Sequence, residues 1–205
     1  MSNNEVTLTH AKIYTPYKTI ENGYLSFVKD HITALGDQDE LGEPSGTCID
    51  LNGKSILPGF IDVHVHGGNN ASFMDEDFDQ FNEVCLYHAR NGTTSLLATT
   101  TTASADKIKR SLGKLAEAIE KGCKGAQILG VHLEGPFINE KRCGAQEKST
   151  IIEPNLFLME EFLASSDHTI KLVTMATELD PKYEVTHALL NKGITVSIGH
   201  SDASY

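Results

Sequence analysis

From residue 54 onward, short apolar runs alternate with segments of helical periodicity, and this alternation constrains the fold more than any other feature. Strands are predicted over residues 55–65, 93–99, 127–134, 170–175 and 194–198, and helices over residues 78–91, 104–121, 154–165 and 181–191. The first run, SILPGFIDVHV, is almost wholly apolar and predicts a strand buried on both faces. Strands that alternate with helices predict an α/β fold with a parallel sheet.

The number of predicted strands indicates an incomplete barrel. A closed (β/α)8 barrel of the TIM type takes roughly 250 residues, whereas residues 54–205 supply about five strands. We therefore expect an incomplete (β/α)8 barrel that lacks three βα units, in a chain truncated at Tyr205. A complete open sheet of about five strands is the alternative.

Residues 5–53 carry a different pattern. Short runs of strand-forming residues, separated by turn residues, predict strands over residues 6–14, 23–29, 31–35 and 47–51. Lys29 and Asp30 are expected at a tight hairpin turn. We therefore expect two domains, a small all-β domain over residues 1–53 and an α/β domain over residues 54–205.

The composition excludes several classes of partner. The chain of 205 residues has a formal net charge of −11, and no basic run is long enough to predict nucleic-acid binding. No apolar stretch of about 18 residues predicts a membrane span, and no signal peptide is recognisable, so a cytoplasmic location is expected. The cysteines are widely spaced and predict free thiols rather than a zinc ribbon or a disulfide framework. They are Cys48, Cys85, Cys123 and Cys143.

Two histidines, His64 and His66, end the first predicted strand of the α/β domain. Residues two apart on a strand project to the same side, so both imidazoles could reach one cation. Gly67 and Gly68 follow at once and end the strand. Because the C-terminal ends of strands are where sites form in such folds, the pair predicts a metal site.

Two more strands end in residues that can bind metal. Glu134 closes an apolar run before Gly135 and Pro136, and a buried carboxylate is costly there unless it is paired or bound to metal. A structural ion pair is the alternative for Glu134. His200 follows the last predicted strand. Imidazole and carboxylate ligands suit Zn²⁺, Fe²⁺, Mn²⁺ or Co²⁺ without selecting among them.

Other polar residues near these strand ends have two readings each. Asp62 shares the parity of His64, and either supports the pair or is an ordinary buried carboxylate. His132 shares the parity of Glu134, and either supports the ligands from behind or is a packed, hydrogen-bonded histidine. The run Thr99–Thr102 ends a predicted strand and is explained by a turn at that point, without a role in the site. The remaining histidines are expected to lie far from the site, as structural or exposed residues: His10, His31, His88, His168 and His187.

Four segments together resemble the amidohydrolase superfamily and, within it, the N-acetylglucosamine-6-phosphate deacetylases. They are PGFIDVHVHGG, NGTTSLLATTTT, LGVHLEGPFINEKRCGAQ and GITVSIGHSDA, in the order and spacing of that family from about residue 50 onward. The two histidines are shared across the superfamily, whereas HLEGPF and GHS favour the deacetylases over dihydroorotase-like or deaminase-like enzymes. Residues 5–53 resemble the first part of the small β-sandwich domain that precedes the barrel.

The resemblance implies roles for single residues. His64 and His66 would hold the more exposed metal of a binuclear site, Glu134 would ligate or bridge, and His200 would hold the second metal. One or two divalent ions per site are therefore expected. Ala145 and Gln146 would lie in a loop that contacts substrate, and Gln146 stands where some relatives have histidine.

The implied activity is hydrolysis of the acetamide of N-acetylglucosamine 6-phosphate to glucosamine 6-phosphate and acetate. A metal-activated water would attack, and a carboxylate would pass a proton to the departing amine. The aspartate general base, another histidine ligand and the phosphate-binding residues are expected beyond residue 205, so the chain alone is expected to be inactive. A homodimer is expected at full length. The alternatives are an inactive metal-binding fragment or another amidohydrolase, such as an N-acetylgalactosamine-6-phosphate deacetylase.

Overall fold

The chain folds into two compact units, Met1–Pro58 and Gly59–Tyr205. The computed structural model describes residues 4–204, so residues 1–3 and 205 of the expected domains lie outside the described residues. The first unit extends past residue 53 because β5 (Ser55–Ile56) pairs in parallel with β1 (Glu5–Tyr14).

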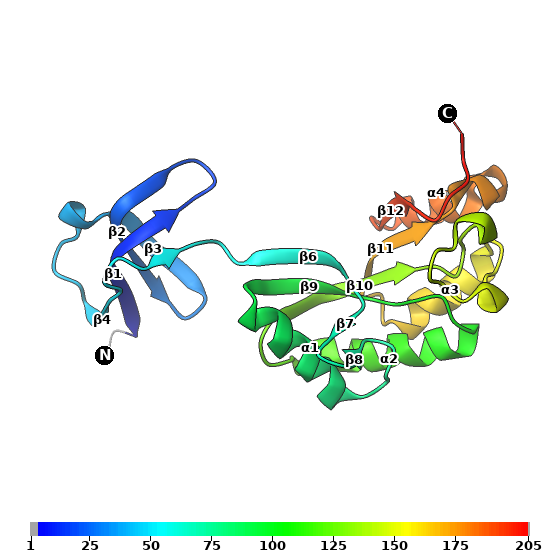
Figure 1. Ribbon diagram of the computed structural model, residues 1–205, viewed down its shortest axis with the longest axis horizontal. Helices are drawn as coiled ribbons and strands as arrows, with labels where there is room; N and C mark the ends of the chain where they lie inside the picture. The colour runs from blue at the N-terminus through cyan, green and yellow to red at the C-terminus, as the bar shows by residue number, and fades with distance from the viewer. Residues whose placement is uncertain (1–3, 205) are drawn as a thin grey trace. The chain divides into compact units, whose positions relative to one another are not determined.

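The first unit is a small β domain. Its sheet has the order β3-β2-β1-β4, formed by β1, β2 (Thr19–Val28), β3 (His31–Asp37) and β4 (Gly46–Asp50) (Figure 1). The predicted hairpin is confirmed, because Val28 pairs with His31 across the turn. Three buried side chains, Ala11, Ile13 and Ile20, form the centre of the unit.

The second unit contains a curled parallel sheet that forms half of a barrel (Figure 1). Within residues 4–204 it is five-stranded, in the order β12-β11-β10-β9-β6. Its strands are β6 (Phe60–Val65), β9 (Thr93–Thr99), β10 (Gln127–Glu134), β11 (Ile170–Met175) and β12 (Thr195–Ile198). Every pairing between them is parallel. The prediction of an incomplete (β/α)8 barrel preceded by a small β domain is therefore confirmed.

Four helices separate these strands. They are α1 (Phe78–Arg90), α2 (Ala105–Lys121), α3 (Leu156–Ser165) and α4 (Glu184–Asn191). Polar side chains cap three of the N-termini, for example Ser104 on α2 and Asn155 on α3. The predicted starts of the last two helices are too early, because Asn155 is the cap of α3 and a 3-10 turn over Pro181–Tyr183 precedes α4.

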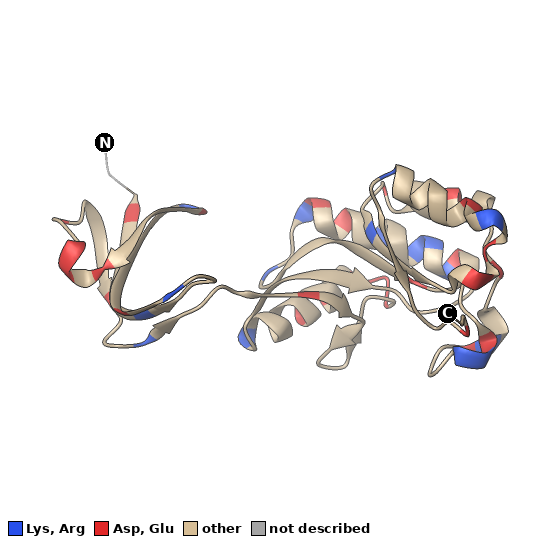
Figure 2. Ribbon diagram, turned by 90° about the horizontal axis from the view of Figure 1, so that it is seen from above, with Lys and Arg blue, Asp and Glu red and all other residues tan. Residues whose placement is uncertain are grey.

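The main core lies between the helices and the sheet. On α2, Ile108, Leu112 and Leu115 recur at helical spacing and are fully buried. They belong to the same cluster as Val131 and Leu133 of β10. Figure 2 shows charged residues at intervals along the helices of this unit.

The expectation for residues 55–65 is wrong in two respects. Pro58 interrupts the run, so that β5 joins the first unit and β6 begins only at Phe60. Strand β6 is also exposed, with Phe60 and Ile61 exposed by 65% and 66%. The reason is its position, because among the described strands β6 pairs only with β9. The short hairpin of β7 (Gly67–Gly68) and β8 (Ala71–Ser72) was not predicted.

Candidate metal centre

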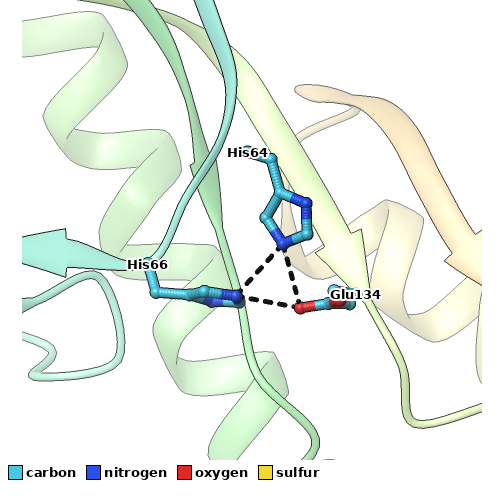
Figure 3. Close-up of side chains that lie close together, drawn as sticks. All are labelled: His64, His66 and Glu134. Carbon is cyan, nitrogen blue, oxygen red and sulfur yellow. Dashed lines mark hydrogen bonds and ion pairs between the residues drawn. The ribbon is translucent and has the colours of Figure 1, made fainter. Parts of the chain in front are cut away.

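His64 and His66 lie at the C-terminal end of β6 and point to the same side, as Figure 3 shows. Their Nε2 atoms are 3.2 Å apart. The backbone N–H of Val65, between them, donates to Thr99 Oγ1 on β9 at 2.8 Å. This bond holds the main chain at the end of an edge strand, and with it the side from which the two histidine side chains project.

Glu134 is the last residue of β10 and is only 3% exposed. The chain turns immediately after it through Gly135, which has a positive φ of 69°. A Cβ atom at this position would overlap Thr102 Oγ1, so the turn requires glycine. The glycine thus allows a buried carboxylate to stand at the end of a central strand.

These three side chains converge (Figure 3). Glu134 Oε2 lies 2.9 Å from His66 Nε2 and 3.3 Å from His64 Nε2. Two ligands at ordinary zinc–nitrogen and zinc–oxygen distances in a tetrahedral site lie roughly 3.3 Å apart. The three donor atoms therefore have both the chemistry and the spacing to hold a divalent cation.

His200 lies on the other side of the same carboxylate. Its Nε2 atom is 2.9 Å from Glu134 Oε1, the oxygen that does not face the histidine pair. Its Nδ1–H donates to the carbonyl oxygen of Arg142 at 2.8 Å, which leaves Nε2 directed at Glu134. Glu134 is thus placed between His64 and His66 on one side and His200 on the other, as a bridging ligand would be.

The electrostatics of the cluster favour an ionised carboxylate. Burial by itself would raise the pKa of Glu134, but hydrogen bonds from His66 and His200 and the nearby His64 lower this pKa to about 2. The hydrogen bond to Glu134 raises the pKa of His66 against the opposing effect of burial. The Nδ1 atom of His66 is buried without a hydrogen-bond partner among residues 4–204.

His132 lies directly behind His64, with ring centroids 4.8 Å apart. Its Nδ1–H donates to Val63 O at 2.9 Å, and its Nε2 accepts from Thr174 Oγ1 at 2.7 Å. Burial and the neighbouring His64 lower the pKa of His132 to about 4. Both ring nitrogens of this neutral histidine are therefore occupied by protein partners, and its contact with the site is through the edge of His64.

Two other residues, Asp62 and Thr174, contact the surroundings of the histidine pair. Asp62 Oδ1 accepts from the backbone N–H of His64 at 3.0 Å, so it contacts the main chain and not the ring. Thr174, which orients His132, was missed by sequence reasoning. A buried threonine in the apolar run IKLVTM near a strand end was the available signal.

Gln146, expected to contact substrate, also contacts Glu134 directly. Its Nε2 donates to Glu134 Oε2 at 3.1 Å. Ala145 and Gln146 also line a hollow of about 310 Å³, together with His66, Thr101, Thr102 and Glu147. The structure therefore brings both residues to the histidine pair and opens a space beside them.

One expectation for the remaining histidines is wrong. His88 on α1 does not lie far from the site, because its Nε2 contacts Gly67 O at 3.0 Å, just after His66. A histidine inside a helix gave no sequence signal for this contact. His10 pairs with Asp50 in the first unit, and His31 pairs with Asp30.

A half-barrel with residues that could hold a metal ion at the C-terminal ends of its strands is an arrangement found in hydrolases, and the sequence agrees with such a class. Residues 55–205 match the model of the amidohydrolase family, and the chain belongs to this family.

Several of its curated relatives are sugar-phosphate deacetylases. The N-acetylglucosamine-6-phosphate deacetylase of Bacillus subtilis is 36% identical over 195 residues, covering 93% of this chain and 49% of that protein. The N-acetylgalactosamine-6-phosphate deacetylase of Escherichia coli O157:H7 is 33% identical over 159 residues, covering 78% and 42%.

Solved structures give the same result. A mutant N-acetyl-D-glucosamine-6-phosphate deacetylase from Mycobacterium smegmatis, in complex with N-acetyl-D-glucosamine-6-phosphate, superposes with a TM-score of 0.89 at 28% identity and covers 99% of this chain. The enzyme from Pasteurella multocida gives a TM-score of 0.85 at 27% identity and covers 97%. The chain spans about half the length of the relatives it matches. Across residues 4–204, none of the helices has the length and apolar character that a membrane crossing requires.

Proposed function

We propose that this chain supplies the metal-binding half of an enzyme that hydrolyses the acetamide of N-acetylglucosamine 6-phosphate to glucosamine 6-phosphate and acetate. The observation that carries the proposal is the position of Glu134 between two sets of histidines, because one carboxylate can then serve two adjacent cations. We ascribe the activity to a protein of the relatives' full length, in which the first unit, up to Pro58, would belong to a β-sandwich domain and the second unit, from Gly59, would belong to the barrel.

The donor set fits a divalent ion, one or two per site. His64 and His66 would hold one, His200 would hold the other, and Glu134 would contact either or both. A bound divalent cation supplies an acidified water and polarises the acetyl carbonyl. The ligand types suit zinc, iron, manganese or cobalt.

The residues of this chain prepare that chemistry. Glu134 stays ionised across the physiological pH range, because its pKa is held near 2. The Arg142 carbonyl fixes the direction of His200, and His132 packs behind His64. Ala145 and Gln146 line the hollow beside His66, and this supports a role for both residues in contacting the sugar. The general acid or base that serves the departing amine is proposed to come from beyond residue 205.

Hydrolysis of N-acetylgalactosamine 6-phosphate is the second candidate, since one relative with 33% identity carries that name. We further propose that the full-length protein is a cytoplasmic homodimer that acts on a small sugar phosphate.

Metal binding is tested on the chain itself. The protein is freed of metal with a chelator and titrated with Zn²⁺ by calorimetry. We expect binding in the parent and its loss in the double variant His64→Ala/His66→Ala. The matched control His31→Ala/His187→Ala removes two exposed histidines outside the cluster and should bind like the parent. Equal binding by both double variants would remove the basis of the proposal.

Substrate is tested with a protein of full length. Residues 1–205 are joined to the second half of the Bacillus subtilis relative, and acetate release is measured with N-acetylglucosamine 6-phosphate, its galactosamine counterpart and unphosphorylated N-acetylglucosamine. We expect release from the first substrate by the chimera, and none by residues 1–205 alone. A chimera that melts cooperatively, binds metal and releases no acetate would overturn the proposed activity.

A further inference from the structure

Gln146 makes two hydrogen bonds in opposite directions. Its Nε2 donates to Glu134 Oε2 at 3.1 Å, and its Oε1 accepts from the backbone N–H of Thr102 at 2.7 Å. The residue belongs to the loop that follows Cys143, and its own N–H donates to Cys143 O at 3.0 Å. One side chain thus connects this loop, the segment after β9 and the end of β10.

The partners determine which way the amide faces. Turned by 180°, Oε1 would face the ionised Glu134 and Nε2 would face the N–H of Thr102, so both contacts would be repulsive. Only the observed orientation satisfies both neighbours. The Thr102 N–H therefore holds the amide as a donor toward Glu134.

The amide acts on the oxygen that faces the histidine pair. Glu134 Oε2 lies within 3.3 Å of both imidazole Nε2 atoms and also receives the hydrogen bond from Gln146. The other oxygen contacts His200. With a fixed donor on one oxygen and a histidine on the other, the carboxylate plane cannot rotate without breaking a hydrogen bond in a buried place.

We propose that Gln146 is a positioning residue that holds the Glu134 carboxylate in the plane it needs to serve both metal positions, with Thr102 as its backbone anchor. This rests on the proposed function, since it assigns a task to Gln146 within that metal site. Gln146 also borders the hollow beside His66, so one hydrogen of its amide remains for a bound ligand.

The chemistry predicts which replacements are tolerated. Gln146→His keeps an acceptor for the Thr102 N–H and a donor for Glu134 on opposite edges of a neutral imidazole. Gln146→Met keeps the length of the side chain but loses both the hydrogen-bond acceptor and the hydrogen-bond donor. Gln127→Met makes the same chemical change at an exposed position on β10 and is the matched control.

The experiment measures Zn²⁺ affinity by competition with a chromophoric chelator, and thermal melting in excess chelator. Loss of a residue that orients a metal ligand typically weakens binding about 10- to 100-fold, and we expect this for Gln146→Met. The Zn²⁺ affinity of Gln146→His should be much closer to that of the parent, and the affinity of Gln127→Met should equal that of the parent. If Gln146→Met does not melt cooperatively, Gln146→Ala serves the same comparison.

Three results would overturn the inference. The first is parent-like Zn²⁺ affinity in Gln146→Met with only a lower melting temperature, which would mean a structural role. The second is equal weakening by the histidine and methionine variants. The third is a parent protein that binds no Zn²⁺, and this alone would overturn the proposed function as well.

Discussion

The charge of Glu134 should stabilise the metal-free protein, and the substitution Glu134→Gln tests this. Glutamine keeps the size of the side chain and resembles the protonated carboxyl group. The carboxylate is buried, with its oxygens facing three histidines and Gln146. Two opposed effects decide the outcome, because burial disfavours the charge and the hydrogen bonds favour it.

The structure gives the sign and the size. The pKa of Glu134 falls from 4.5 to about 2, so the hydrogen bonds outweigh burial. At roughly 1.4 kcal/mol for each pH unit, this lowering corresponds to about 3 kcal/mol of folding free energy. Because the folded-state pKa is the lower one, this stabilisation is present above pH 4.5 and is lost as the pH falls towards 2. Glu134→Gln should therefore lower the free energy of unfolding by about that amount at pH 7.

The assay is urea unfolding followed by circular dichroism, with excess chelator so that metal does not contribute. Glu117→Gln is the matched control, since Glu117 is an exposed carboxylate on α2 that pairs with Lys114. It should change the unfolding free energy by less than about 1 kcal/mol. The difference between parent and Glu134→Gln should shrink as the pH is lowered from 4.5 towards 2.

The opposite result is well defined. A metal-free Glu134→Gln protein as stable as the parent at pH 7, or more stable, would mean that the cost of burying the charge exceeds the hydrogen bonds of the histidines. The cluster would then lower the stability of the metal-free protein, and its arrangement would be explained by metal binding. A difference that does not depend on pH would refute the electrostatic reasoning itself.

Three further predictions concern other parts of the chain. Thr174→Val removes the hydroxyl donor from the buried Nε2 of His132 and should lower the free energy of unfolding by about 1–3 kcal/mol in urea titrations, whereas an unchanged value would contradict the assigned bond. Ser104→Ala removes the N-cap of α2 and should cost about 1 kcal/mol in the same measurement, with no effect on Zn²⁺ binding. Ile61 is 66% exposed on edge strand β6, so Ile61→Lys should reduce self-association of the chain in analytical ultracentrifugation, and a parent that sediments as a monomer would refute this.

Much of the site could be predicted because its signals are local. His64 and His66 share a face through the two-residue period of a strand, and Glu134 ends a strand before a glycine that the turn requires. His200 follows a third strand, and parallel strands bring their C-terminal ends to one edge. The contact of His88 with Gly67 and that of Thr174 with His132 were missed, because each joins elements distant in sequence.

The sequence by itself determined the alternation of strands and helices and the residue types at the strand ends, because periodicity and glycines act over a few residues. The tertiary structure decided that the sheet is curled into half of a barrel and is not an open sheet. Only the tertiary structure decided that β6 is exposed, since burial depends on how many neighbouring strands are present and not on the apolar character of a run. It likewise decided that Gln146 reaches Glu134 and that His200 takes the second carboxylate oxygen. These contacts join residues 12 and 66 positions apart, so they exist only once the loops have packed over the strand ends.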